Sequence, residues 1–277
     1  MTALFFYIII FVASYLSGLL GALTGLGGGG ILVPLLVLFF HVNIYYAMGA
    51  SLISAMAMST VTSATYLRQG YTNIRIGMFL EIGAVIGALA GAVIVAFLSI
   101  SAISFIFGIM LFISAYLSLR RREDEEQSTS SHSWAIKLRL ASAYPVYGEH
   151  KVYTVQHPPL ALLVMGISGA LSGLLGIGGG IMKVLAMDHV MRLPYKVSTT
   201  TSNFMIGITA AVSAGIYLSR GYINPSVTVP VMLGIIAGSF HGTRLLSRVH
   251  QRILRMVFSA VVCVLGAQMI YKALISI

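Results

Sequence analysis

The sequence predicts an all-α membrane protein built from two inverted repeats of transmembrane helices, each with a Gly-rich broken or re-entrant element. Three observations lead to this fold class: an apolar composition, a series of long apolar runs, and a glycine-rich phrase that occurs twice. The mean hydropathy is +0.94 and only 9% of the 277 residues are charged, whereas about a quarter of the residues in a soluble domain carry charge. The bilayer is therefore the expected solvent.

The apolar runs predict the helices in chain order. A helix needs about 20 apolar residues to cross a hydrocarbon core of about 30 Å, and the ten-residue alternation typical of barrel strands is missing from the sequence. Two runs, 31–40 and 181–187, are too short to cross at about 1.5 Å per residue. Most of the longer runs are candidates for spanning helices, and they cover residues 4–23, 45–67, 76–100, 103–119, 160–175, 202–218, 227–240 and 253–270.

The glycine-rich phrase repeats together with its surroundings. Residues 24–29, Thr-Gly-Leu-Gly-Gly-Gly, are matched by residues 175–180, Leu-Gly-Ile-Gly-Gly-Gly, and residues 66–73 are matched by residues 217–224. Both pairs are separated by 151 residues. Repeated apolar halves, each interrupted by glycines, are typical of secondary transporters. The chain therefore divides into a first transmembrane repeat at 1–119, an inter-repeat loop at 120–157, and a second transmembrane repeat at 158–277.

Charge in the connecting loops indicates how each repeat is oriented. The inter-repeat loop opens with arginines at 120–122, which predicts that it is cytoplasmic. The link at residues 98–101 is uncharged, whereas its counterpart in the second repeat carries Arg244, Arg248, Arg252 and Arg255. Equivalent loops then face opposite sides, which favours inverted repeats with both termini outside the cytoplasm. The alternative is a parallel repeat with four full crossings in each half.

Three further features concern the middle segment, the single cysteine and the net charge. Residues 144–153 place turn formers between β-formers, so this stretch is either a small hairpin or a flexible linker. Cys263 is the only cysteine, which excludes an internal disulfide and a cysteine-built metal site. The net charge of +10 is placed at the ends of apolar runs, where it addresses the membrane surface, so we expect no nucleic-acid partner.

Each glycine run is predicted to break a membrane helix and to bind an anion. Non-helical backbone inside a bilayer is tolerated only where it is buried or lines a polar cavity. Amides at a helix start lack partners and carry the positive end of the dipole, so two such starts brought together would form an anion site. The alternative is that the glycines only allow close helix packing, and a phosphate loop is excluded because no strand precedes the glycines. The amides assigned to the site belong to Gly27, Gly28, Gly29, Gly30, Gly178, Gly179 and Gly180.

Three ionisable residues lie within or beside the apolar runs, where charge is costly and usually functional. Lys183 follows Gly180 by three residues, and its ammonium is a candidate to complement the anion; alternatively, it snorkels to the cytoplasmic surface. Glu81 is the candidate carrier of a coupling proton, or else it pairs with Arg75 near the helix end. His241 either titrates near neutral pH or only hydrogen-bonds at a crowded helix crossing.

A run of hydroxyl and amide side chains follows Pro194. It covers residues 198–203, Ser-Thr-Thr-Thr-Ser-Asn, whereas the matching stretch of the first repeat, 47–52, keeps only Ser51. Such groups either donate to a bound oxyanion or cap the helix. Because six polar residues exceed what one cap requires, we assign Ser51, Ser202 and Asn203 to orient the solute.

These motifs resemble those of the TauE/SafE family of sulfite-exporter-like membrane transporters. Residues 25–34, Gly-Leu-Gly-Gly-Gly-Gly-Ile-Leu-Val-Pro, match the first family motif, and residues 176–184, Gly-Ile-Gly-Gly-Gly-Ile-Met-Lys-Val, match the second. Residues 201–207 resemble the segment that usually follows, whereas Leu185 stands where the second motif often has proline. The resemblance covers nearly the whole chain except the middle loop. It implies export or uptake of small sulfur-containing or organic anions, such as sulfite or sulfonates, with proton linkage.

The expected function is that of a transporter for a small anion, working by rocking of one repeat against the other. We expect no cofactor and no metal, and an intramembrane enzyme is disfavoured because the sequence has no His-Glu-x-x-His or Gly-x-Ser-x-Gly motif. A passive anion channel and a membrane subunit of a larger complex remain alternatives. The expected location is the cytoplasmic membrane of a prokaryotic cell, and assembly into a homo-oligomer is left open.

Overall fold

The computed structural model describes residues 3–25, 27–119, 133–146, 149–245 and 251–275. The first repeat contains α1 (Ala3–Thr24), α2 (Gly29–Phe39), α3 (Ile44–Arg68), α4 (Ile74–Ile94), the 3-10 turn η1 (Val95–Phe97) and α5 (Ile100–Leu119). Between the repeats lie α6 (Ser133–Lys137), β1 (Ser142–Val146) and β2 (Glu149–Tyr153). The second repeat contains α7 (Pro158–Leu175), α8 (Gly180–Leu185), the π-helical turn η2 (Ala186–Val190), α9 (Tyr195–Ser219), α10 (Pro225–Leu245) and α11 (Gln251–Ile275).

Within the described residues, eight helices are long and apolar enough to cross a membrane. They are α1, α3, α4 and α5 of the first repeat and α7, α9, α10 and α11 of the second. The most buried of them are α3 and α9, which pack against each other. The predicted α-helical membrane protein is confirmed, and α2 and α8 are short helices, as the short runs 31–40 and 181–187 indicated.

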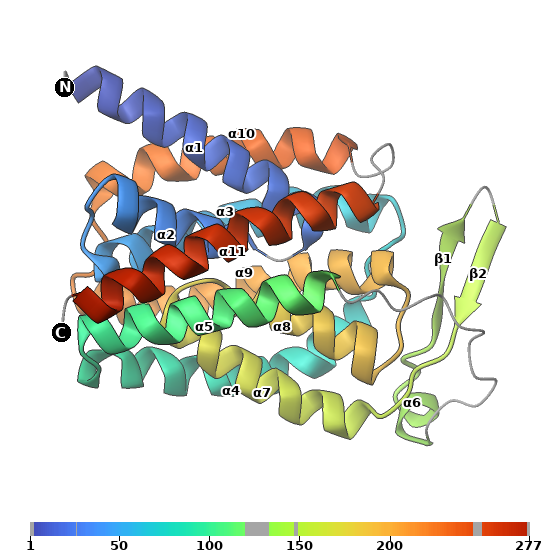
Figure 1. Ribbon diagram of the computed structural model, residues 1–277. Coiled ribbons are helices and arrows are strands. Elements are labelled where there is room, and N and C mark those ends of the chain that lie inside the picture. The colour runs from blue at the N-terminus through green and yellow to red at the C-terminus, as the bar shows by residue number, and fades with distance from the viewer. Residues whose placement is uncertain (1–2, 26, 120–132, 147–148, 246–250, 276–277) are drawn as a thin grey trace.

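Helices that are far apart in the sequence pack in pairs, and the pairs recur between the two halves. α1 lies along α10, α4 lies along α7, and α5 packs against α11 (Figure 1). Small residues let these backbones approach closely. Gly87 of α4 packs against Gly166 of α7, and Gly238 of α10, 151 residues after Gly87, packs against Tyr15 of α1. Glycines outside the two motifs therefore join the first half of the chain to the second.

The inter-repeat segment folds into a hairpin at one end of the helix bundle (Figure 1). β1 pairs with β2 in antiparallel register, from Ser142 opposite Tyr153 to Val146 opposite Glu149. The hairpin alternative is therefore confirmed for these strands. Tyr153 belongs to a second hydrophobic cluster that also contains residues of α4, α7 and α9, so the hairpin is docked on the bundle. The arginines at 120–122 and Arg248 lie outside the described residues.

Asn73, at the start of α4, holds the inter-repeat segment in place. Its Nδ2 donates to Leu140 O at 2.9 Å and to the Tyr153 hydroxyl at 2.7 Å, and its Oδ1 accepts from Ile76 N at 3.1 Å. We expect Asn73→Ala to lower the free energy of unfolding by about 1–3 kcal/mol, because buried polar partners are left unpaired. Limited proteolysis of the detergent-purified protein should show faster cleavage within residues 133–157.

The matched control for this prediction is Asn224→Ala. Asn224 stands 151 residues after Asn73 and caps α10 at an exposed site, where its Oδ1 accepts from Ser226 N at 3.0 Å. Loss of this cap should lower the free energy of unfolding by about 1 kcal/mol and leave cleavage of the inter-repeat segment unchanged. Equal cleavage in both variants would contradict the anchoring role of Asn73.

Candidate functional site

Two tight glycine turns connect α1 to α2 and α7 to α8. Gly25 and Gly27 have φ values of +69° and +74°, and Gly176 and Gly178, 151 residues later, have φ values of +66° and +72°. Glycine adopts these values readily because it has no Cβ. The repeat in the sequence therefore extends to the backbone conformation at these two pairs of glycines, whereas Gly28 has a φ of −54° and its counterpart Gly179 a φ of +69°.

The chain reverses direction at each glycine turn. Ser17 Oγ of α1 donates to Gly28 O at 2.6 Å, and Ser168 Oγ of α7 donates to Gly179 O at 3.2 Å. Each short helix therefore begins beside the spanning helix that precedes it. We did not predict either serine from the sequence, although the 151 residues between them are the separation that relates the glycines and could have identified them.

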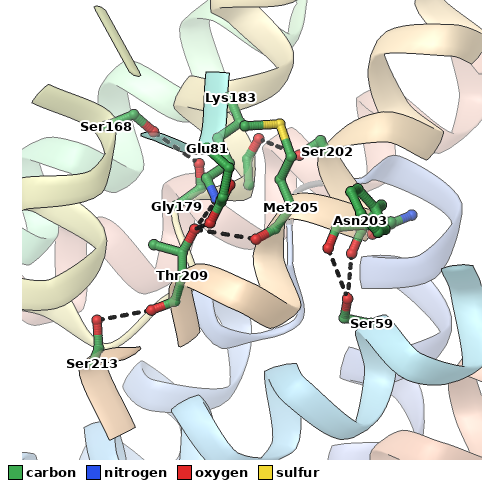
Figure 2. A network of polar contacts seen from close by, with 12 residues as sticks. Ser59, Glu81, Ser168, Gly179, Lys183, Ser202, Asn203, Met205, Thr209 and Ser213 are labelled. Atoms are coloured by element: carbon green, nitrogen blue, oxygen red, sulfur yellow. Dashed lines mark hydrogen bonds and ion pairs between the residues drawn. The ribbon is translucent and has the colours of Figure 1, made fainter. Parts of the chain in front are cut away.

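The two glycine turns contact each other. Ser202 Oγ of α9 lies 3.0 Å from Gly25 O in the first turn and 3.2 Å from Gly180 O beside the second (Figure 2). A Cβ added to Gly29 would lie 2.9 Å from Ile177 Cα. The structure therefore brings together both glycine motifs and Ser202 of the predicted site.

The motif glycines are buried and closely packed in this conformation. A Cβ on Gly25 would lie 2.7 Å from Thr199 O, and a Cβ on Gly28 would lie 3.1 Å from Ser17 O. Close packing therefore accounts for glycine at these positions, and the assignment of their amides to an anion stays a prediction. The other buried motif glycines are Gly27, Gly29, Gly30, Gly176, Gly178, Gly179 and Gly180.

Buried polar atoms without a hydrogen-bond partner surround the two turns. In the described part of the chain they include Ser51 Oγ, Ser172 Oγ, Thr199 Oγ1 and Asn203 Oδ1, from side chains that are at most 1% exposed. Ser51 and Thr199 lie against glycines of the first motif, and Ser172 lies against Gly179. An unpaired buried polar atom costs about 1–3 kcal/mol and requires a reason. Packing alone does not supply one, because an apolar side chain of similar size would pack equally well.

A buried ion pair lies at the junction of α4, α8 and α9 (Figure 2). Lys183 Nζ is 3.3 Å from Glu81 Oε2, and the two side chains are 0% and 5% exposed. Thr209 Oγ1 accepts from Lys183 Nζ and contacts Glu81 Oε1, and it also lies 3.1 Å from Met205 O. The charges of the cluster are therefore balanced inside the protein.

The structure decides several alternatives that the sequence left open. Lys183 is fully buried, so the alternative that it snorkels to the surface is wrong. Glu81 pairs with Lys183 and not with Arg75, which donates instead to a backbone oxygen before β1 at 3.3 Å. His241 is exposed, and its Nδ1 lies 2.9 Å from a backbone oxygen of its own helix, which agrees with the hydrogen-bonding alternative.

The polar run at residues 198–203 lies inside α9. The residue before the helix is Pro194, where no side chain makes a capping hydrogen bond, so the capping alternative is wrong. Asn203 Nδ2 donates to Ala22 O of α1 at 3.2 Å, and Asn203 O accepts from Ser59 Oγ of α3 at 2.6 Å. Asn203 thus connects three helices next to the first glycine turn. We did not assign Ser59 to the site from the sequence.

An open groove of about 490 Å³ lies at the opposite end of α2 from its glycine turn. It runs between α2 and α11, where Lys272 Nζ donates to Val37 O at 3.0 Å and so complements the negative end of the α2 dipole. The motif glycines do not line this groove. Its lining residues are Leu38, Phe39, Gln268, Tyr271, Lys272 and Ile275.

Comparison with known families identifies the group to which this fold belongs. The family model described as Sulfite exporter TauE/SafE matches residues 10–269, a range that contains both glycine turns and the buried ion pair. The chain belongs to the TauE/SafE family. The resemblance inferred from its sequence motifs is confirmed.

Similar curated proteins share the description of membrane transporter. The chain is 26% identical over 277 residues to the probable membrane transporter protein YunE of Bacillus subtilis, covering 98% of this chain and 99% of that protein. It is 27% identical over 245 residues to YdhB of the same organism, covering 85% and 89%. It is 24% identical to the probable membrane transporter protein MJ0441 of Methanocaldococcus jannaschii, covering 95% and 94%.

No solved structure matches the chain. The family match and the eight candidate spanning helices within the described residues both indicate a membrane protein. This TauE/SafE protein is a multi-pass membrane transporter.

Proposed function

We propose that this TauE/SafE transporter moves a small sulfur-containing or organic anion, of the sulfite or sulfonate type, across the cytoplasmic membrane of a prokaryotic cell. The observation that carries the proposal is the set of unpartnered buried polar atoms around both glycine turns. The hydroxyls of Ser51, Ser172 and Thr199 can donate to an oxyanion. The first-turn amides of α2 add the positive end of a helix dipole.

The residues proposed to bind the anion come from both repeats. Asn203 and Ser202 hold the two turns in position through α9, and Lys183 supplies the positive charge next to the second turn. The proposed binding residues are Gly27, Gly28, Gly29, Gly30, Gly178, Gly179, Gly180, Ser51, Ser202, Asn203, Lys183, and, in addition to those assigned from the sequence, Ser172 and Thr199.

Two features support an arrangement of inverted repeats. α1 begins and α11 ends at the same end of the bundle, whereas the hairpin between the repeats lies at the opposite end (Figure 1). An odd net number of passages in each repeat agrees with this placement. If each helix is replaced by its counterpart in the other repeat, the packed pair α1–α10 becomes the packed pair α7–α4. In this arrangement α2 and α8 are re-entrant elements. The close packing of both glycine turns then corresponds to an occluded state of the carrier, which opens when one repeat rocks against the other.

The proton-carrying group in this proposal is the carboxylate of Glu81. It is buried, it faces Lys183, and it lies on a helix that packs against the second repeat. Ionisable groups placed this way inside a membrane protein are expensive and usually functional.

Transport by purified protein in proteoliposomes tests the proposal. We expect uptake of labelled sulfite and of methanesulfonate, and at least tenfold lower uptake by the double variant Ser51→Ala/Thr199→Val. Because these two hydroxyls have no hydrogen-bond partner in the described structure, their removal should leave the melting temperature unchanged or slightly higher. Uptake that ignores a pH gradient in the wild type would instead favour the passive channel.

The matched control is Ser114→Ala. Ser114 is a buried serine of α5 whose hydroxyl donates to Met110 O of its own helix at 2.6 Å, and it is not among the groups nearest to the motif glycines. We expect this variant to take up anions at the wild-type rate. Equal uptake by the wild type and by the double variant would assign the glycine turns to packing alone.

A further inference from the structure

We propose that Lys183 is an exchangeable counter-ion, for which the transported anion and Glu81 compete, so that each monovalent anion is carried together with one proton. The inference deepens the proposed function and rests on it, because it requires that an anion reaches the second glycine turn. It adds a defined stoichiometry, the charge class of the substrate, and electroneutral transport.

The surroundings of Glu81 restrict the charges that can balance it. α8 faces it with Lys183, and α9 faces it with Thr209. α5 and α7, which lie beside these helices, contain no Asp, Glu, Lys, Arg or His between Ile100 and Leu119 or between Pro158 and Leu175. Lys196 of α9 lies over the Tyr71 ring at 5.6 Å, at the start of that helix. Within the described residues, Lys183 is therefore the cation that balances the carboxylate.

The position of Lys183 lets it serve a second partner. Lys183 N donates to Gly179 O at 3.1 Å, so Lys183 stands one helical turn after the second glycine turn, and a long side chain on a helix extends back toward the helix N-terminus. Ser172, whose hydroxyl is buried and unpartnered, lies against the same glycine. An anion at this turn would therefore meet the Lys183 ammonium and the Ser172 hydroxyl.

Charge balance then couples the two ligands. With Glu81 ionised, the Lys183–Glu81 pair is neutral, and adding an anion would leave an uncompensated negative charge in a buried site, which is strongly unfavourable. If Glu81 takes up a proton, Lys183 is released to the anion and the site is neutral again. The proton resides on the Glu81 carboxylate and leaves when the anion leaves. One monovalent anion and one proton therefore move together, with no net charge.

The repeat does not duplicate this charged cluster, which combines Glu81 of the first half with Lys183 and Thr209 of the second. The positions 151 residues away from Lys183, Thr209 and Glu81 are occupied by Leu32, Met58 and Met232, and Leu32 and Met58 are fully buried. The two glycine turns thus share left-handed glycines at two matching positions but differ in the charge beside them. Because one exchangeable counter-ion serves both turns, each transport cycle carries one anion and one proton.

Methanesulfonate uptake into proteoliposomes tests this coupling, because this anion stays monovalent over the pH range of the assay and cannot itself carry the proton. For the wild type, we expect a tenfold accumulation for each unit of imposed pH gradient and no response to a potassium–valinomycin potential. For Glu81→Gln, we expect no response to the pH gradient and about tenfold accumulation for each 59 mV of potential, positive inside. Asp188→Asn is the control, because Asp188 lies 3.7 Å from His189 on η2 and does not pair with Lys183.

A second variant keeps the test decisive if Glu81→Gln does not fold. The double variant Lys183→Leu/Glu81→Met gives both positions the residue types found 151 residues away, at Leu32 and Met232. It should remain folded and lose accumulation of methanesulfonate. Wild-type accumulation that follows the potential and ignores the pH gradient, or wild-type behaviour of either variant, would overturn the coupling while anion transport itself stands. Absence of uptake for sulfite and methanesulfonate alike would overturn the proposed function, and this inference with it.

Discussion

Replacing Lys183 alone by leucine should lower the free energy of unfolding by about 3–5 kcal/mol, the effect expected when one partner of a buried ion pair is removed. Lys183 is fully buried and its ammonium lies 3.3 Å from Glu81 Oε2. The leucine would leave the carboxylate of Glu81 facing apolar side chains and Thr209. Thermal and chemical unfolding of the detergent-purified protein would measure the loss.

The second substitution Glu81→Met should restore most of this stability. Buried ion pairs replaced by apolar residues of similar volume are often as stable as the original pair or more so, and the chain carries Leu32 and Met232 at the positions 151 residues away from Lys183 and Glu81. A double-mutant cycle should therefore give a large coupling energy between Lys183 and Glu81. Additive losses in the two single variants would mean that the pair does not interact in the folded protein.

Substitution of Gly87 by alanine is expected to have the next largest effect. A Cβ at this position would overlap Gly166 O across the α4–α7 contact, and overpacking of this kind typically costs about 1–3 kcal/mol. Gly238→Ala should have a similar effect, because Gly238 meets Tyr15 O across the equivalent α1–α10 contact. The melting temperature in detergent and the yield of monodisperse protein would measure both.

The control for these glycine substitutions is Gly215→Ala in α9. A Cβ there has no neighbour within 4 Å, so alanine should add up to about 1 kcal/mol through its higher helix propensity. Destabilisation by Gly87→Ala together with stabilisation by Gly215→Ala would show that the loss at Gly87 comes from overpacking at the helix contact and not from helix propensity. Stabilisation at all three positions would show that the helix pairs can move apart to accept a side chain.

The sequence predicted the membrane fold because its signals are local. Runs of about 20 apolar residues are enough to identify spanning helices, and the described structure has helices at each of the long runs. The 3-10 turn η1 ends the long run 76–100 early, since α4 stops at Ile94. The stretch at 144–153 could not be assigned to a hairpin or a linker because a two-stranded hairpin depends on what it packs against. Burial of Tyr153 and its contact with Asn73 supply that support.

The partner of each charged residue could not be predicted in the same way. Lys183 and Glu81 are 102 residues apart, and no spacing within a helix relates them. In the sequence, the opposite charge considered for Glu81 was Arg75, and that alternative is wrong because Glu81 pairs with Lys183. Two of the site serines, Ser17 and Ser168, were missed because a serine inside an apolar run usually bonds to its own helix.

The sequence by itself determined the solvent of this protein, the positions of its long apolar helices, and the duplication of a glycine motif, because composition, periodicity and repetition are properties of the chain. The tertiary structure alone decided that the two turns touch through Ser202 and that Glu81 neutralises Lys183. The reason is that helix packing fixes which residues from distant segments meet. In a medium without water, that meeting determines whether a buried charge or hydroxyl has a partner.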